Sequence, residues 1–163
     1  MREEPVAARR LTAVERVRAN LFVGLGLARR AMTLGVKAYV TDGERVLLVR
    51  HTYLPGWHLP GGGVERRETV WDAVAKEVRE ETHVGLTGRP ALFGVYKNGR
   101  TSRFDHIAMF VARDWREVRV FEPNFEIAEC RFFPQDDLPD EAVAATAARV
   151  REVEGDLPPA DHW

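Results

Sequence analysis

Three glutamates within one helical turn are the residues of this sequence best suited to chemistry. Glu77, Glu80 and Glu81 stand at spacings i, i+3 and i+4 in a segment with helical periodicity, so their side chains project from one side of a helix. Like charges at these spacings repel each other. Carboxylate oxygens are the ligands that Mg²⁺ prefers, and this ion usually meets its substrate through phosphate groups. The cluster therefore predicts a divalent-metal site.

The position of these glutamates on the helix distinguishes them from ordinary surface carboxylates. On a helical wheel that starts at Val70, the apolar residues Val74 and Val78 fall at roughly 40° and 80°. Glu81 falls at about 20° and Glu77 at about 340°, so both border the apolar stripe. A solvated, charge-rich helix is the alternative. The glycine run 61–63 before the helix favours the metal site, because glycine lets backbone approach a phosphate closely.

The segment 62–84 resembles the Nudix box, G-x5-E-x7-R-E-U-x-E-E-x-G-U, in which U is a bulky apolar residue. The matching residues are Gly62, Glu68, Glu77, Val78, Glu80, Glu81 and Val84. Lys76 stands where the family has arginine, and His83 stands where it has glycine. The resemblance implies a Nudix-type α/β/α sandwich with a mixed β-sheet, which we place at residues 33–155.

The resemblance also implies roles for individual residues. The carbonyl of Gly61 is expected to join Glu77, Glu80 and Glu81 as ligands of Mg²⁺, for which Mn²⁺ can substitute. A water then attacks a phosphorus of a diphosphate, and the candidate bases are Glu77, Glu80 and Glu126, the last in a loop before the final strand. Glu68 is expected to be a structural partner of the helix.

The two departures have physical consequences. Lys76 keeps a positive charge but lacks the bidentate fork of a guanidinium, so we expect it to hold Glu77 less firmly than arginine does. His83 adopts a positive φ less readily than glycine. Gly85 offers an alternative end for the helix.

Substrate contacts are expected just before the box and in a later loop. Tyr53 and Trp57 can stack on a base, although Trp57 fits a core position equally well. Gly62 is expected to approach the substrate's phosphates, and Arg100 to reach a phosphate or a ribose. The predicted substrate is a small nucleotide, either a nucleotide sugar such as ADP-ribose or a nucleoside triphosphate.

Other function classes fit this sequence less well. A Nudix-fold module that senses nucleotides without turnover is the alternative, although such modules usually lose the box carboxylates, which are all present here. An isoprenoid diphosphate isomerase of this fold needs a catalytic cysteine, and Cys130 is a poor candidate because it lies in an apolar run. The net charge of −1 gives no basic surface for nucleic acid. A single cysteine is consistent with a reducing, cytoplasmic location.

The chain divides into three predicted parts. Residues 1–32 form a basic helical arm, expected to pack on the domain or on a second copy in a homodimer, with contact to a membrane surface as the alternative. Residues 33–155 form the Nudix domain, and 156–163 a C-terminal tail. Strands are predicted at 35–40, 46–49, 91–96, 106–112 and 129–133, and a helix at 140–153. Asp42 and Gly43 are expected to form a hairpin turn between the first two strands.

Overall fold

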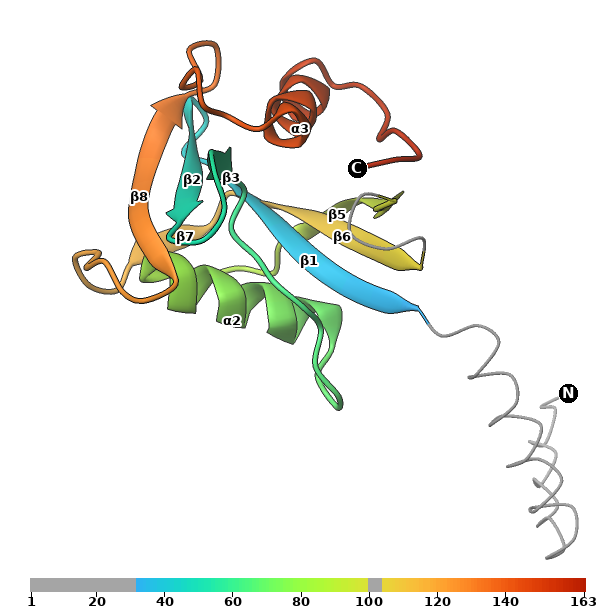
Figure 1. Ribbon diagram of the computed structural model, residues 1–163, viewed down its shortest axis with the longest axis horizontal. Coiled ribbons are helices and arrows are strands. Elements are labelled where there is room, and N and C mark those ends of the chain that lie inside the picture. The colour runs from blue at the N-terminus through green and yellow to red at the C-terminus, as the bar shows by residue number, and fades with distance from the viewer. Residues whose placement is uncertain (1–31, 100–103) are drawn as a thin grey trace, which may run out of the picture. The chain divides into compact units, whose positions relative to one another are not determined.

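The computed structural model describes residues 32–99 and 104–163 of the chain. The predicted N-terminal arm and Arg100 lie outside the described residues. The strands, shown with the helices in Figure 1, are β1 (Thr33–Val40), β2 (Arg45–His51), β3 (Trp57–His58), β4 (Val84–Leu86), β5 (Ala91–Lys97), β6 (Asp105–Ala112), β7 (Trp115–Glu117) and β8 (Ile127–Pro134). The helices are α2 (Val70–Thr82) and α3 (Ala144–Glu154).

The strands lie between the two helices, as Figure 1 shows. Alternate residues of one strand belong to two different core clusters, because successive side chains of a strand point to opposite faces. In β6, Ala108 and Phe110 join the cluster that contains α2, whereas Met109 joins the cluster that contains Val150 of α3. The expected α/β sandwich with a mixed sheet is confirmed.

The strands pair in an order that local patterns do not reveal. β1 pairs with β6 in parallel, and β5 pairs with β6 antiparallel, so this sheet is mixed. β2 lies between β3 and β8, both antiparallel to it. The expected turn at Asp42 and Gly43 is present, but it does not join a paired hairpin of β1 and β2. Gly43 does turn the chain with φ +102, but only one bridge, between Thr41 and Val46, joins the strands before they enter different sheets.

Helix α2 begins and ends with specific caps. The Thr69 side chain accepts a hydrogen bond from the Asp72 N–H, and the Asp72 carboxylate accepts one from the Thr69 N–H, which forms a capping box. At the other end His83 adopts the left-handed conformation, with φ 59° and ψ 19°. The suggestion that Gly85 ends the helix is wrong, since Gly85 already pairs with Arg116 in the β4–β7 ladder.

Helix α3 begins four residues later than predicted because the preceding backbone pairs with β3. The Trp57 N–H donates to the Glu141 carbonyl at 3.0 Å, and the Val143 N–H donates to the Trp57 carbonyl at 3.2 Å. This segment is extended where it bridges Trp57, so the helix starts only at Ala144. Among residues 32–99 and 104–163, neither helix has the length and apolar content needed to span a bilayer.

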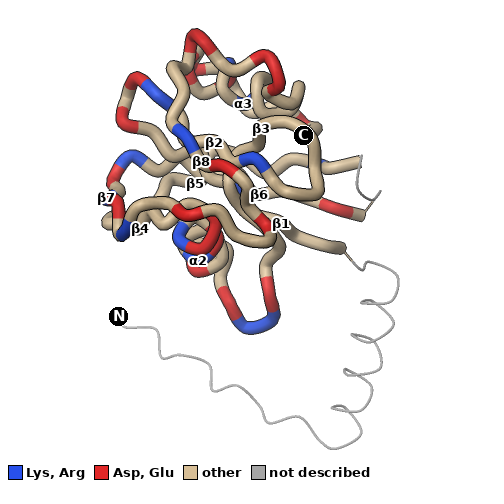
Figure 2. Tube along the Cα trace, turned by 60° about the vertical axis from the view of Figure 1, so that its left-hand side comes forward, with Lys and Arg blue, Asp and Glu red and all other residues tan. Residues whose placement is uncertain are grey.

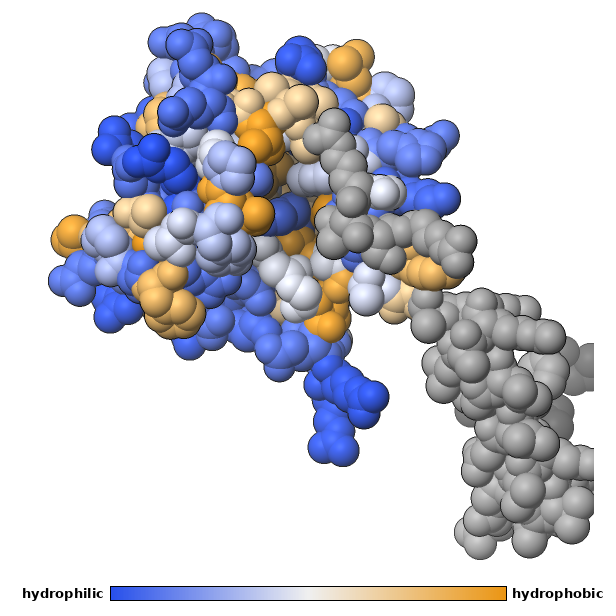
Figure 3. Space-filling model, in the orientation of Figure 1, coloured by the Kyte–Doolittle hydropathy of each residue, from blue (hydrophilic) through white to orange (hydrophobic). Residues whose placement is uncertain are grey.

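Charged residues of both signs are distributed over the described trace, as Figure 2 shows. The space-filling view in Figure 3 shows hydrophobic residues beside hydrophilic ones around a hollow on this face of the domain.

Candidate metal centre

Glu81 is the most deeply buried of the three helical glutamates. Only 5% of the residue is exposed, and its Oε2 accepts a hydrogen bond from the Gly61 N–H at 2.7 Å. Burial raises the pKa of Glu81 to about 7, against the opposing effects of Lys37 and of the Gly61 hydrogen bond. Glu81 thus joins helix α2 to the glycine loop through a carboxylate that a nearby cation would keep ionised.

The glycine loop lies too close to its neighbours to carry side chains. Gly61 has φ +137, and a Cβ there would lie 2.1 Å from the Val36 carbonyl oxygen. A Cβ on Gly62 would lie 2.6 Å from Oε2 of Glu77. The loop is fastened to β1 by hydrogen bonds such as Val36 N–H to the Gly62 carbonyl, at 2.8 Å. Two glycines therefore bring the loop backbone against both β1 and the carboxylate of Glu77.

Glu77 and Lys76 do not form the close pair that the box arginine would suggest. The Lys76 Nζ lies 3.1 Å from Glu65, 3.3 Å from Glu68 and 3.7 Å from Glu77. Burial raises the pKa of Glu77, Lys76 lowers it, and the charge of Glu80 raises it further. Lys76 is thus nearest to Glu65 and Glu68, the second of which also accepts from the Glu65 N–H.

Glu80 and Val78 lie on different sides of the same helix. Glu80 is exposed, beside a depression that His83 and Arg119 also line. Val78 is fully buried and, with Val84, belongs to the core cluster that contains α2. The structure thus brings Glu77 and Glu81 towards the glycine loop and leaves Glu80 at the surface.

Glu126 and His51 complete a group of possible ligands around Glu81. One ligand atom from each of His51, Glu81 and Glu126 lies within 4.8 Å of the others. Burial lowers the pKa of His51 to about 4, so its imidazole is neutral at physiological pH. His51 Nδ1 is buried and has no hydrogen-bond partner among the described residues. A neutral imidazole can bind a divalent metal, in contrast to an imidazolium.

Lys37 contributes a positive charge to this cluster, and neither it nor His51 was among the residues predicted from the sequence to form the site. Its Nζ donates to the carbonyls of Gly61 at 2.7 Å and Leu59 at 2.9 Å. Burial lowers the pKa of Lys37, and the charges of Glu81, Glu77 and Glu126 raise it. The sequence did offer a signal for Lys37, because it is a charged residue between Val36 and Ala38, which are buried in the strand.

The donors fit a hard divalent cation. Several carboxylates, a backbone carbonyl and mostly oxygen donors suit Mg²⁺ or Mn²⁺. Burial is the main cause that raises the pKa values of Glu77 and Glu81, and Lys37 lowers both. The Gly61 carbonyl accepts a hydrogen bond from Lys37, so its expected role as a metal ligand remains a proposal.

The two aromatic residues expected at the substrate occupy different environments. Tyr53 is 63% exposed, and its hydroxyl donates to Glu126 Oε1 at 3.3 Å. Trp57 is only 5% exposed, with its ring 4.7 Å from that of Phe133 and the Arg50 guanidinium 5.6 Å from its ring centre. The expectation that Trp57 stacks on a substrate is corrected, because core side chains cover its ring.

A cavity of about 580 Å³ adjoins the metal-ligand group. His51, Thr52, Leu54, Ala128 and Val143 are among its lining residues. His51 also belongs to the group with Glu81 and Glu126, so the cavity and the candidate centre share this residue. Its lining is more apolar than polar, which suits the ring of a bound small molecule.

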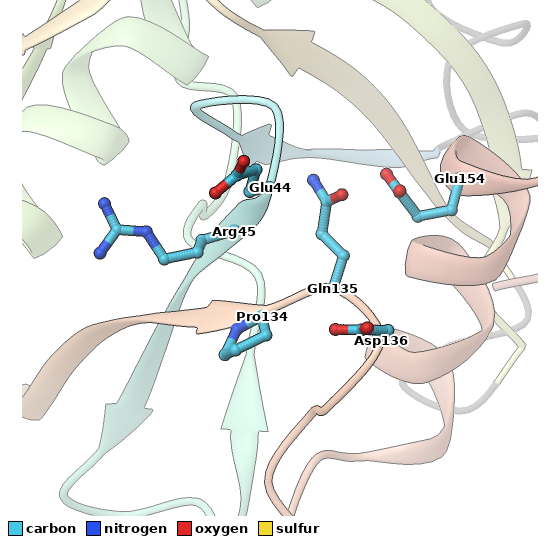
Figure 4. Close-up of a pocket in the computed structure, with 6 residues that line it drawn as sticks. All are labelled: Glu44, Arg45, Pro134, Gln135, Asp136 and Glu154. Atoms are coloured by element: carbon cyan, nitrogen blue, oxygen red, sulfur yellow. The ribbon is translucent and has the colours of Figure 1, made fainter.

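A second cavity, of about 600 Å³, lies away from these residues. Figure 4 shows its lining of Glu44, Arg45, Pro134, Gln135, Asp136 and Glu154. The Tyr39 hydroxyl donates to Glu154 at 2.8 Å, and the Gln135 amide lies 2.8 Å from the Thr41 hydroxyl. These contacts join β1, β8 and α3, so we interpret the network as structural.

Cys130 does not supply a nucleophile. Burial raises the pKa of its thiol to about 12, so the thiolate is scarce at neutral pH. The residue packs against the core cluster that contains α2.

Comparison with curated proteins finds relatives that share part of the chain. Diphosphoinositol polyphosphate phosphohydrolase 2 from Rattus norvegicus is 34% identical over 98 residues, which are 56% of this chain and 52% of that protein. A putative 8-oxo-dGTP diphosphatase from Bacillus subtilis (strain 168) is 31% identical over 68 residues, 42% of this chain and 45% of that protein. The chain thus spans about half the length of these relatives.

Solved structures match over more of the fold. A MutT Nudix hydrolase from Burkholderia pseudomallei superposes with a TM-score of 0.64 and 29% identity, covering 74% of this chain and 97% of that one. An ADP-ribose pyrophosphatase from Streptococcus suis has a TM-score of 0.57 and 25% identity, covering 80% and 95%. The family model described as the NUDIX domain matches residues 31–153. The chain belongs to the Nudix family.

Proposed function

We propose that this chain is a pyrophosphohydrolase that cleaves the diphosphate linkage of a nucleoside diphosphate joined to a second group. The observation that carries the proposal is the convergence of Glu77, Glu81 and Glu126 beside a glycine loop that is tightly held against β1. The cofactor is Mg²⁺, with Mn²⁺ as a substitute. The substrate is a nucleotide sugar such as ADP-ribose or a nucleoside triphosphate.

The proposed ligands are Glu77, Glu80, Glu81 and the Gly61 carbonyl, with Glu126 and His51 completing the site. When bound, the metal supplies charge neutralisation at the phosphate oxygens and lowers the pKa of a coordinated water. Glu126 is the base best placed to accept a proton, since it is half-buried beside Glu81 and bonded by Tyr53. Glu80 and Glu77 are the other candidates.

Three relatives support cleavage of a phosphoanhydride. Their names refer to a diphosphoinositol polyphosphate, to 8-oxo-dGTP and to ADP-ribose. All three compounds contain a phosphoanhydride, so cleavage of that bond is the chemistry that we transfer to this chain. The cavity beside His51 and the exposed ring of Tyr53 suit the ring-containing end of such a substrate.

The test is a product assay with purified protein. ADP-ribose, a UDP-sugar, 8-oxo-dGTP and a diphosphoinositol polyphosphate are each incubated with Mg²⁺ or with a chelator, and the phosphorylated products are separated. We expect turnover of at least one compound with metal only. Glu81→Gln should reduce kcat by a factor of about 10² or more, because the substituted amide cannot supply the negative charge. Glu44→Gln is the matched control, since Glu44 lies at the second cavity, away from the candidate centre.

Two results would contradict this proposal. Turnover that persists in chelator, or in Glu81→Gln, would show that helix α2 supplies no metal ligand that the reaction needs. Tight binding of a nucleotide without any product, with all the box glutamates intact, would favour the alternative of a non-catalytic sensing module.

A further inference from the structure

His83, the residue that replaces the glycine of the Nudix box, contacts the loop that leads to Glu126. This loop comprises residues 118–126 and joins β7 to β8. His83 adopts the left-handed backbone conformation that glycine would provide, yet its side chain is buried, with 6% of the residue exposed. Ending the helix requires only the backbone conformation. The buried ring therefore needs a separate explanation.

The ring of His83 bonds the loop on both edges. Its Nδ1 lies 3.3 Å from the Val120 carbonyl oxygen, and its Nε2 lies 2.8 Å from a guanidinium nitrogen of Arg119. Because a carbonyl only accepts and a guanidinium only donates, these partners assign the proton to Nδ1. The ring also lies 5.5 Å from that of Phe121, and the His83 carbonyl accepts from the Val118 N–H at 2.9 Å. Four consecutive loop residues thus contact His83.

The far end of the loop is held by different groups. Asn124 Oδ1 accepts hydrogen bonds from the N–H groups of Glu126 and Ile127, each at 2.8 Å. The Thr52 N–H donates to the Glu126 carbonyl at 2.9 Å. In the first half, Val118 and Val120 are 55% and 77% exposed, whereas Phe121 is half-buried beside the His83 ring. His83 is therefore the main attachment of the first half of this loop to helix α2.

We propose that His83 is a positioning residue that fixes the Glu126 loop to the end of α2, so that Glu126 is held against Glu81. The inference rests on the proposed function, in which Glu81 and Glu126 serve one metal centre. Glu81 and His83 lie in the same last turn of the helix. The end of α2 therefore carries Glu81, a proposed ligand, and His83, which positions Glu126.

The test compares His83→Gly and His83→Asn with wild type. Both substitutes tolerate the left-handed conformation, so α2 should still end at this residue. Glycine removes all side-chain contacts with the loop. Asparagine keeps a donor at the position of Nδ1 but cannot reach Arg119, so it should behave as an intermediate. Hydrogen exchange of residues 118–126 is measured in chelator, and the Mn²⁺ Kd is measured by the loss of the free-ion EPR signal.

We expect exchange in this segment to be about tenfold faster in His83→Gly, because two hydrogen bonds are lost. The Mn²⁺ Kd should rise up to about tenfold, because the loop that leads to Glu126 loses its attachment to α2. His83→Asn should fall between this variant and wild type. Arg119→Ala should reproduce part of the effect and add little to His83→Gly, because the same hydrogen bond is already absent.

Unchanged exchange in His83→Gly would overturn the proposal. Faster exchange with an unchanged Mn²⁺ Kd would also overturn it, because the loop would then be attached without serving the metal centre. Failure of the proposed function is distinguishable from both results. In that case wild type itself would bind no Mn²⁺ and would release no product from any diphosphate tested.

Discussion

The buried carboxyl of Glu81 makes the stability of the metal-free protein depend on pH. Burial raises its folded pKa to about 7, so between pH 4.5 and 7 the folded state binds a proton that the unfolded state has lost. The stability contributed by this group is therefore present at low pH and is lost as the pH rises through about 7. His51 acts oppositely, because its folded pKa is lowered to about 4, and its contribution increases towards pH 6.5.

The Glu81→Gln variant distinguishes the pH-dependent stability contribution of Glu81 from that of His51. In chelator, the free energy of unfolding of Glu81→Gln relative to wild type should increase between pH 5 and pH 8, by about 1–3 kcal/mol. Urea unfolding at both pH values measures this difference. Addition of Mg²⁺ at pH 8 should stabilise wild type but not the variant, since the ion binds the folded state. An equal difference at both pH values would show that the carboxyl does not titrate in this range.

Lys37 supplies the positive charge that the glutamates face. Lys37→Met would leave the Gly61 and Leu59 carbonyls without this donor and would remove one positive charge that faces Glu81, Glu77 and Glu126. We expect a loss of about 1–3 kcal/mol in chelator at pH 8, and a smaller loss with Mg²⁺, because the metal restores the missing charge. Thermal unfolding with and without Mg²⁺ measures both values. The same loss in both conditions would place Lys37 outside the metal centre.

At the scale of elements, the loop between β3 and α2 is defined by three glycines with different surroundings. Gly61 meets the Val36 backbone, Gly62 meets the Glu77 carboxylate, and Gly63 has nothing within 4 Å of an added Cβ. A clash with backbone costs more free energy to relieve than a clash with the flexible end of a side chain. Each alanine substitution should therefore affect a different property.

Gly61→Ala should destabilise the fold by about 3 kcal/mol or more, because its φ of +137 and its contact with β1 forbid a side chain. Gly62→Ala should lower stability by only about 1 kcal/mol. It should displace Glu77 and raise the Mn²⁺ Kd roughly tenfold. Gly63→Ala should match wild type in both measurements. Normal Mn²⁺ affinity in a folded Gly62→Ala protein would show that Glu77 is not a metal ligand.

Local patterns predicted the elements better than their partners. The helix over 70–82 was readable because its apolar stripe has helical periodicity and its glutamates match a spaced motif. The pairing of β2 with β8, in place of β1, was not readable, because it depends on contacts between segments far apart in the sequence. His51 and Lys37 were missed for the same reason, as their meeting with Glu81 results from the fold and not from a motif. Trp57 was ambiguous until its packing on Phe133 was known.

At the scale of the domain, α3 is attached to the strands by tyrosine hydroxyls. Tyr39 of β1 donates to Glu154 at 2.8 Å, and Tyr96 of β5 donates to Glu152 at 2.8 Å. Burial is the first cause that raises the pKa of each tyrosine. Both phenols therefore remain donors at physiological pH, and they connect the face opposite α2 to the helix.

Residues 156–163 cover the edge of this arrangement. The Lys97 N–H donates to the Asp161 carbonyl at 2.9 Å, and the Trp163 N–H donates to the Lys97 carbonyl at 3.1 Å, which pairs the end of β5. The Trp163 ring lies 5.4 Å from that of Tyr96, and the buried Arg149 donates to the His162 carbonyl at 3.0 Å. This segment therefore contributes both apolar burial and hydrogen bonds to the domain.

Removal of residues 156–163 should lower the free energy of unfolding by about 2–4 kcal/mol, from one half-buried aromatic side chain and several hydrogen bonds. Trp163→Ala, which keeps the backbone pairing with Lys97, should account for about half of this loss. Urea unfolding of both variants measures the values. The Mn²⁺ Kd of protein that remains folded should be unchanged, because these residues lie on the α3 side of the sheet. A truncated protein as stable as wild type would mean that these contacts contribute nothing to the fold.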